Sequence, residues 1–518
     1  MFRPFLRQAL RTGSGASLVR PVPLSRGARA AVVLGVGFSV GSGILCSQRL
    51  YADTEEHRQS EDDEAKRERL TALSVQPAWE MHEGKWFPNE DPGVTLDKKV
   101  LDMHSSPAPG VAHLETFRLE SNFPCEDHLS WQVSPLPGPA QNWVHLGIYD
   151  GHNGEATSRW LRFALPDAVV GALADLYSKH AALASLSSVD ENSELAPIAD
   201  LVGLIHPPPE EIDQAIKEAF LQVDDDIVHW SAERALAGPS DGRAQQLLAP
   251  ALAGSCALLA FFDTDSRELR MALTGDSRAV LARPARDADG RARWRALALT
   301  QDQNAHNERE MARMEGEHPG ETIGANGRVL GWGMARAFGD AAYKWARELQ
   351  MRLYEGYLCD YPRKNVKTPP YFTAEPEITT TVVQPGDVLV MASDGLWDCL
   401  TNEEVAGLVG AWMEKKKVDQ GMSRWKAGHF PSFEDARYDA IERSQLPVLG
   451  MKPDHTKMYA WWHADKHFVN VDDTLTAHLA RNALGGANVN LTSALLQIEP
   501  PRSRRYKDDI SIIVAVFE

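Results

Sequence analysis

Several carboxylates in this 518-residue chain stand at the ends of predicted strands, where a turn containing glycine or a second acid follows. The pairs are Asp150-Gly151, Gly275-Asp276, Asp394-Gly395 and Asp508-Asp509. A single Asp-Gly pair is more often a simple turn, but glycine also lets the backbone come close to a bound ion. Carboxylates gathered at one edge repel one another unless cations lie between them, and all-oxygen ligands select Mg²⁺ or Mn²⁺ over Zn²⁺. Two such ions can activate a water and neutralise a phosphate, so the pattern indicates metal-assisted phosphate chemistry.

Buried strands are needed to position these carboxylates, and apolar runs bounded by turn residues predict them. The runs are Asn142–Tyr149, Ser255–Phe262, Leu269–Thr274, Asp387–Ala392 and Ile510–Phe517. Their length and near-continuous apolar character are typical of strands buried on both faces. The short polar turn between the second and third runs indicates a hairpin. We therefore expect an α+β fold with a β-sandwich of antiparallel sheets flanked by α-helices, rather than a doubly wound parallel sheet.

Helices are predicted between the strands. Apolar residues recur at steps of three and four along Pro209–Trp230, which places them on one helical face. Thr401 and Glu404 form a capping box ahead of another helix. Leu475–Leu484 is expected to be helical and to end at a pair of glycines.

The composition excludes some classes of function. Lys and Arg number 54 and Asp and Glu 72, which gives a net charge of −18. A protein this acidic is repelled by nucleic acid phosphates, so we expect no nucleic-acid partner. The five cysteines are scattered without a CxxC pair, which favours free buried thiols over a disulfide framework or a zinc site.

The amino-terminal region differs from the rest of the chain. Residues 1–29 are rich in arginine and serine and contain no acid, as mitochondrial targeting segments do. Residues 30–48 carry no charge and are long enough for a single membrane span, although a cleaved signal core has the same pattern. Residues 49–94 read as a charged linker, and the folded domain is expected over residues 95–518, with an insertion at about 415–470.

Seven segments, in order along the chain, resemble the metal-dependent serine/threonine protein phosphatases of type 2C. They are PCEDHLS, YDGHNG, GSCALLAFF, LTGDSRAVL, ARAFGD, ASDGLWDCLTNEE and YKDDISIIV. Four more segments are similar to the branch that contains mitochondrial pyruvate dehydrogenase phosphatase: NAHNEREMARMEGEHP, FGDAAYKW, TPPYFTAEPE and HLARNALGG. The resemblance implies the same sandwich, with two Mg²⁺ or Mn²⁺ ions at one end and a phosphorylated protein as substrate.

Individual site residues follow from the motif matches. The resemblance implies that Asp150 bridges two metals, that the Gly151 carbonyl binds one of them, and that Asp394 and Asp508 hold the other. It also implies that Glu126 and Asp127 support the site directly or through water, and that Asp276 and Asp398 can hold a third metal. His152 matches a proposed general acid, although a histidine that positions water would fit the same motif.

The sequence departs from the family pattern at two positions and has two long segments outside the motifs. Asn122 replaces the arginine that grips the substrate phosphate in many members, so the metals or another arginine must do more here. Ala335 replaces a serine, with little expected consequence. Residues 343–370 are expected to form a flap near the site. The aromatic-rich insertion at 415–470 is either a subdomain packed on the sheet or a docking surface for a protein substrate.

These observations favour an active mitochondrial protein phosphatase, with pyruvate dehydrogenase as the substrate that the resemblance suggests. Two alternatives stay open: an inactive relative that acts as a binding module, and hydrolysis of a small phosphorylated metabolite. The compartment is also open. A matrix enzyme suits that substrate, whereas a membrane span after an arginine-rich start would place the domain in the intermembrane space.

Overall fold

The computed structural model describes residues 79–82, 85–88, 96, 99–135, 142–187, 207–420 and 440–518. The chain divides into two units, Met1–Asp91 and Pro92–Glu518. In the first unit the described residues form a hairpin of β1 (Trp79–His82) and β2 (Lys85–Pro88). The expected targeting segment at 1–29 and the expected membrane span at 30–48 lie outside the described residues. Within the described part of the chain, every helix is too short or too polar to cross a bilayer.

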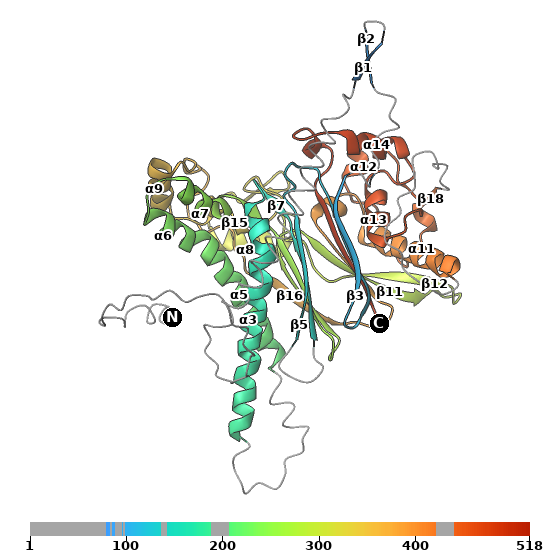
Figure 1. The fold of residues 1–518 in the computed structure, drawn as a ribbon, viewed down its shortest axis with the longest axis horizontal. Coiled ribbons are helices and arrows are strands. Elements are labelled where there is room, and N and C mark those ends of the chain that lie inside the picture. Colours follow the sequence, from blue (N-terminus) through green and yellow to red (C-terminus); the bar gives the residue numbers. More distant parts are fainter. Residues whose placement is uncertain are drawn as a thin grey trace, which may run out of the picture. The chain divides into compact units, whose positions relative to one another are not determined.

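The second unit is built on two antiparallel sheets (Figure 1). The five-stranded sheet has the order β16 (Glu377–Val382), β10 (Glu268–Thr274), β9 (Ala257–Asp263), β6 (Asn142–Tyr149) and β5 (His128–Pro135). The six-stranded sheet has the order β12 (Ala292–Ala298), β11 (Arg278–Arg286), β17 (Val388–Ala392), β20 (Ile510–Phe517), β4 (Val111–Leu119) and β3 (Val100–Ala108). All pairings within these sheets are antiparallel, which confirms the predicted fold class.

Apolar side chains from the two sheets meet in a shared core. Leu146, Leu258 and Met271 come from the five-stranded sheet, and Leu389 and Ile513 from the six-stranded sheet; all are at most 2% exposed. The outer faces of the central strands are also buried, because helices cover them. Burial on both faces is why these strands read as continuous apolar runs instead of alternating ones.

Helices cover both outer faces. The five-stranded sheet packs against a group of helices coloured turquoise to green in Figure 1: α3 (Ala156–Ser187), α5 (Pro209–Asp225), the π-helix η2 (Asp226–Trp230), α6 (Ser231–Leu236) and α7 (Gly242–Leu252). The six-stranded sheet packs against a group coloured orange to red: α11 (Asn402–Gln420), α12 (Met458–Trp461), α13 (Leu475–Ala483) and α14 (Val489–Gln497). The domain is therefore a four-layered αββα sandwich.

The domain also contains shorter elements. A small sheet has the order β15 (Phe338–Gly339), β8 (Gly254–Ser255) and β7 (Gly151–His152). Two further pairs are β13 (Gly324–Ala325) with β14 (Arg328–Val329), and β18 (Ile441–Glu442) with β19 (His467–Phe468). Further helices in the described part of the chain are α8 (Glu308–Glu317), α9 (Arg347–Tyr357) and α10 (Asp394–Trp397), with 3₁₀ turns η3 (Ala341–Tyr343), η5 (Arg443–Gln445) and η6 (Ser503–Arg505).

Most of the expected elements are confirmed, with two local differences. The expected strand Ser255–Phe262 is split at Cys256, because the Cys256 N–H donates to the Asp150 carbonyl (2.8 Å) rather than to a regular ladder. The expected helix Pro209–Trp230 changes to a π-helix over its last turn. The capping box is present: the Thr401 N–H donates to Glu404 (2.8 Å) and the Glu404 N–H donates to Thr401 Oγ1 (3.2 Å).

The described part of the insertion, residues 440–470, packs on the helical side of the six-stranded sheet. Leu446, Tyr459 and Phe468 are buried in the core beneath α11 and α13. This favours the packed-subdomain interpretation, whereas the aromatics between 421 and 439 lie outside the described residues. The expected flap at 343–370 contains α9, whose Leu353 is buried in the core on the other side of the sandwich.

Candidate metal centre

Three of the expected carboxylates meet at one edge of the sandwich. Asp150 follows β6, Asp276 follows β10, and Asp394 follows β17 as the first residue of α10. One carboxylate oxygen from each lies within 4.8 Å of the other two. Strands from both sheets therefore deliver acids to one point, as the strand-end pattern predicted.

Two of the glycines beside these acids permit a close approach between chain segments. A Cβ at Gly151 would collide with the carbonyl oxygen of Glu126, and a Cβ at Gly395 would collide with the carbonyl oxygen of Asp509. A larger residue at either position would push apart the loops that carry the acids. These glycines thus allow the carboxylates to gather.

The gathered carboxylates resist ionisation. Burial, followed by the negative charges of the neighbouring aspartates, raises the pKa of Asp150 and of Asp394 well above the ordinary value. Burial and the charge of Asp509 raise the pKa of Asp127 to about 8, and burial raises the pKa of Asp276 to about 6. Divalent cations would relieve this repulsion, and the ligand atoms are hard oxygens, so the residues fit Mg²⁺ or Mn²⁺.

Asp509 organises the loop that carries Glu126 and Asp127. Its carboxylate accepts the backbone N–H groups of Ser121 (2.5 Å), Asn122 (2.8 Å) and Glu126 (2.8 Å). The Asn122 side-chain amide also donates to Asp509 (3.0 Å) and more weakly to Asp508 (3.4 Å). Asn122 occupies the position where many proteins with the resembling motifs have an arginine that binds phosphate. Here its side chain points toward Asp508 and Asp509.

Glu126 and Asp508 extend the three-acid group at this edge of the sandwich. We call the edge that carries Asp150, Asp276, Asp394, Glu126 and Asp508 the acidic edge. Glu126 accepts the N–H of Gly154 (2.6 Å) through one oxygen and a guanidinium N–H of Arg504 (2.6 Å) through the other. Asp508 lies 3.9 Å from the same Arg504 nitrogen. The charge of Asp508 adds to the raised pKa of both Asp150 and Asp394, so it acts electrostatically on the three-acid group.

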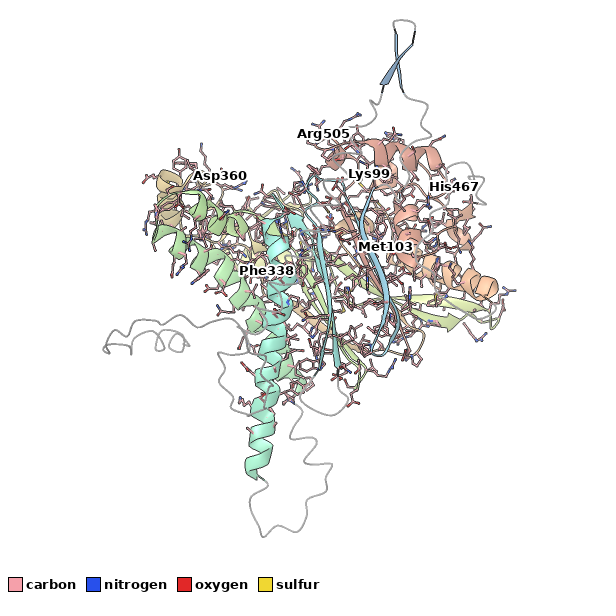
Figure 2. The ribbon with its side chains drawn as sticks, in the orientation of Figure 1. Lys99, Met103, Phe338, Asp360, His467 and Arg505 are labelled. Carbon is pink, nitrogen blue, oxygen red and sulfur yellow. The ribbon has the colours of Figure 1, made fainter. Side chains whose placement is uncertain are left out.

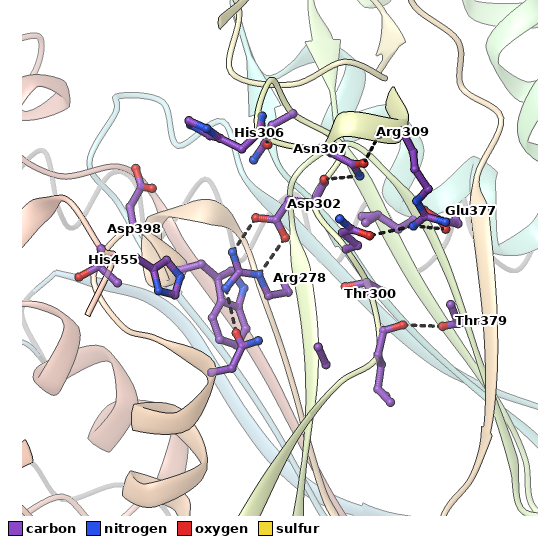
Figure 3. A pocket seen from close by; sticks show the side chains of 18 of the residues that line it. Arg278, Thr300, Asp302, His306, Asn307, Arg309, Glu377, Thr379, Asp398 and His455 are labelled. Atoms are coloured by element: carbon purple, nitrogen blue, oxygen red, sulfur yellow. Dashed lines mark hydrogen bonds and ion pairs between the residues drawn. The ribbon is translucent and has the colours of Figure 1, made fainter. Parts of the chain in front are cut away.

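Asp398 borders a cavity of about 810 Å³ (Figure 3). Its backbone carbonyl accepts the N–H groups of Lys457 and Met458, and its carboxylate lies 3.5 Å from the Lys457 ammonium. Arg278, in the cavity wall, binds Asp302 through two N–H groups (2.8 and 2.6 Å). The cavity is therefore bordered by one of the expected third-metal residues, and its lining combines charged and polar residues with apolar ones.

His152 is held by a partner that the sequence did not reveal. Its Nε2 lies 2.7 Å from a carboxylate oxygen of Asp340, and the Trp332 ring packs against the imidazole with centroids 5.0 Å apart. Burial lowers the pKa of His152, but the negative charge of Asp340 and the hydrogen bond to it outweigh burial, so the net pKa is raised. The histidine is therefore prepared to carry a proton beside the acidic group.

The four described cysteines are free and buried, as expected from their spacing. Cys256 donates its S–H to Asp276 (3.1 Å), and burial raises its pKa well above the usual range. Cys399 packs in the core under α11. A protonated, buried thiol is a poor nucleophile, which agrees with their interpretation as small apolar residues.

Three contributors received no individual role from the sequence: Asp340, Asp509 and Arg504. Asp340 ends the ARAFGD segment and Asp509 is the second acid of the DD pair, so both carried a signal in motifs that had been noted. Arg504 lies in the run RSRR, whose basic character stands out in an acidic chain. The role of each residue depends on contacts with segments that are distant in the sequence.

Comparison with known proteins agrees with this geometry. The protein phosphatase 2C family profile matches residues 119–427. A protein phosphatase 2C homolog of Schizosaccharomyces pombe is 36% identical over 79% of this chain and 81% of its own length. The mitochondrial pyruvate dehydrogenase (acetyl-transferring) phosphatase 1 of Saccharomyces cerevisiae is 33% identical over 79% of this chain and 69% of its own. Its human counterpart is 28% identical over 81% of this chain and 80% of its own. The chain therefore belongs to the protein phosphatase 2C family and is a serine/threonine protein phosphatase of that type.

Proposed function

We propose that this phosphatase works in mitochondria and removes phosphate from serine or threonine of the pyruvate dehydrogenase complex. The observation that carries the proposal is the similarity, over most of the chain, to phosphatases whose names state that substrate and that organelle. The arginine-rich, acid-free residues 1–29 support the same compartment independently.

The proposed metal ligands are the residues of the acidic edge. Asp150, the Gly151 carbonyl, Asp394 and Asp508 hold two divalent ions, with Glu126 and Asp127 in support and Asp276 and Asp398 available for a third. When bound, Mg²⁺ or Mn²⁺ supplies a water nucleophile at neutral pH and positive charge for the phosphate. One carboxylate oxygen from each of Asp150, Asp276 and Asp394 lies within 4.8 Å of the other two. This supports a metal-binding role for Asp276 close to the two proposed ions.

His152 is the proposed general acid. With Asp340 accepting from Nε2, the imidazolium keeps a second proton on Nδ1 that it can give to the leaving serine or threonine oxygen. Asp340 stabilises the positive charge of the ring before the transfer and fixes its orientation. The alternative role, in which His152 only positions a water, predicts no dependence on the leaving group.

A protein substrate suits the surroundings of the site better than a small metabolite. The cavity beside Asp398 is lined mainly by polar and charged residues from several elements, which leaves room for polypeptide next to a phosphoresidue. The described part of the insertion borders this cavity through His455, Thr456 and Lys457. A small phosphate ester would leave most of this surface unused.

The proposal is tested by activity and by location. The purified full-length chain should dephosphorylate phosphorylated pyruvate dehydrogenase at least tenfold more efficiently, as kcat/KM, than phosphorylated casein. Removal of residues 1–29 should leave the catalytic domain active but keep it out of mitochondria. Equal efficiency on the two proteins would contradict the substrate, and import of the truncated chain would contradict the targeting role.

Protease protection distinguishes the two mitochondrial compartments. A domain in the matrix should survive protease after the outer membrane is ruptured and be lost only when the inner membrane is opened. Degradation after outer-membrane rupture alone would place the domain in the intermembrane space and contradict direct action on a matrix complex.

A further inference from the structure

Arg504 is an exposed cation at the acidic edge. Its side chain is 44% exposed, and its Nη1 lies 2.6 Å from Glu126 and 3.9 Å from Asp508, both assigned above as metal ligands. Both contacts use one nitrogen, whereas the guanidinium is planar and has five N–H donors. The group can therefore turn another edge outward while it stays beside the site.

The backbone that carries Arg504 is anchored to the loop of the metal centre. The Ser503 hydroxyl donates to the Ser121 carbonyl, and the Ser121 hydroxyl donates to the Lys507 carbonyl (2.8 Å). The Lys507 ammonium donates to the Glu120 carbonyl (3.1 Å). The short turn η6 is thus fixed on both sides of Arg504, so the long side chain has a defined base at the rim of the acidic group.

A phosphate monoester carries two negative charges, so it needs positive groups in addition to those that neutralise the carboxylates. Asn122, which stands where an arginine grips phosphate in many family members, is neutral and donates to Asp509. Arg504 contacts the same loop through Glu126. Its fork of N–H groups matches phosphate oxygens in a bidentate manner, which an ammonium cannot do.

We propose that Arg504 binds the substrate phosphoryl group and replaces the cation that is absent at position 122. This inference rests on the proposed metal site. When phosphate enters, Arg504 exchanges its contact with Glu126 for one with a non-reacting phosphoryl oxygen. Glu126 stays in place because its other oxygen accepts the Gly154 N–H. Arg504 is then a substrate-binding residue that favours dianionic phosphate esters.

The test is binding of inorganic phosphate to the full-length chain in saturating Mg²⁺, measured by calorimetry, together with KM for a phosphoserine peptide. Arg504→Gln should weaken phosphate binding and raise KM by about 10- to 100-fold, because a charge-assisted, bidentate contact is lost. Arg504→Lys should recover part of the affinity, since it keeps the charge but not the fork.

Arg505→Gln is the matched control. Arg505, labelled in Figure 2, is an exposed neighbour on the same turn, and its replacement removes the same charge from the chain. Its phosphate affinity and KM should stay within about twofold of wild type. The thermal midpoint of each variant, and its Mg²⁺ affinity measured without phosphate, show whether the fold and the metal site are intact.

Three results would overturn the inference. The first is unchanged phosphate affinity in Arg504→Gln with Mg²⁺ bound. The second is a loss that is fully explained by weaker Mg²⁺ binding, because that would make Arg504 a brace for Glu126. The third is an equal loss in Arg505→Gln, which would indicate a general charge effect. A wild-type chain that neither binds phosphate nor hydrolyses the peptide with Mg²⁺ would instead contradict the proposed metal site itself.

Discussion

Asp394→Asn is the substitution whose consequences follow most directly from the structure. The side chains are nearly isosteric, so the change removes one negative charge and little else. Asp394 follows β17, which is fully buried between β11 and β20, so the sandwich around it should remain intact. The effect should therefore fall on metal binding.

The expected loss of metal affinity can be estimated from the role of Asp394 in the three-acid group that it forms with Asp150 and Asp276. Loss of a residue that merely supports a metal ligand costs about 10- to 100-fold in affinity, and loss of an anionic ligand should reach at least the upper end, about 100-fold or about 2.8 kcal/mol. The metal-free protein should respond in the opposite direction. The ligand oxygens lie within 4.8 Å of one another, so each pair of ionised carboxylates repels by about 3 kcal/mol or more at an effective dielectric of about 20. The variant should thus be at least as stable as wild type in chelator.

Two measurements check this prediction. A Mn²⁺ titration of phosphoserine-peptide hydrolysis should show the midpoint shifted about 100-fold upward in Asp394→Asn. Thermal unfolding in EDTA should show a midpoint equal to or above that of wild type. Asp289→Asn, which removes a charge from a side chain that is 69% exposed in the β11–β12 turn, should match wild type in both. Wild-type activity at limiting Mn²⁺, or a marked loss of stability in EDTA, would refute the assignment of Asp394.

Three further predictions follow from the site and the core. His152→Ala should slow hydrolysis of a phosphoserine peptide by about 10²–10⁴-fold but slow p-nitrophenyl phosphate much less, because nitrophenolate needs little protonation; equal slowing would contradict the general-acid role. In EDTA the free energy of unfolding should fall as pH rises from about 4 to 8. The cause is that the raised pKa values of Asp276 (about 6) and Asp127 (about 8) make the native state hold more protons than the unfolded chain. Denaturant titrations that show rising stability over this range would contradict this prediction. Ile513→Ala, at a fully buried position between the sheets, should cost about 2–5 kcal/mol in urea unfolding, and a cost below 1 kcal/mol would contradict the packing described.

Five of the central strands could be predicted, because burial on both faces leaves a continuous apolar signal. The central strands β4 and β11 were missed, because charged residues interrupt their apolar runs. β6 and β20 have the bounds that the sequence indicated. The edge strands β12 and β16 were missed, since each has few buried residues and is rich in arginine or threonine. Their position in the sheet is decided by pairing with β11 and β10, which a local pattern does not contain.

The site could be predicted in part for the same reason. Acids at strand ends with a neighbouring glycine pointed to the group of Asp150, Asp276 and Asp394, because local features identify strand ends. The pair of His152 and Asp340 joins residues 188 positions apart. It exists because β8 pairs with both β7 and β15, which brings the ARAFGD segment next to the histidine. Such a contact follows from topology alone.

Metal dependence of turnover tests the central claim most directly. The full-length chain is stripped with EDTA and assayed for phosphate release from a phosphoserine peptide, and Mn²⁺ or Mg²⁺ is then added back in steps. We predict no turnover in chelator and a saturable return of activity with either ion. Full activity in excess EDTA, or a stripped chain that stays inactive at millimolar metal although it is folded, would contradict the account.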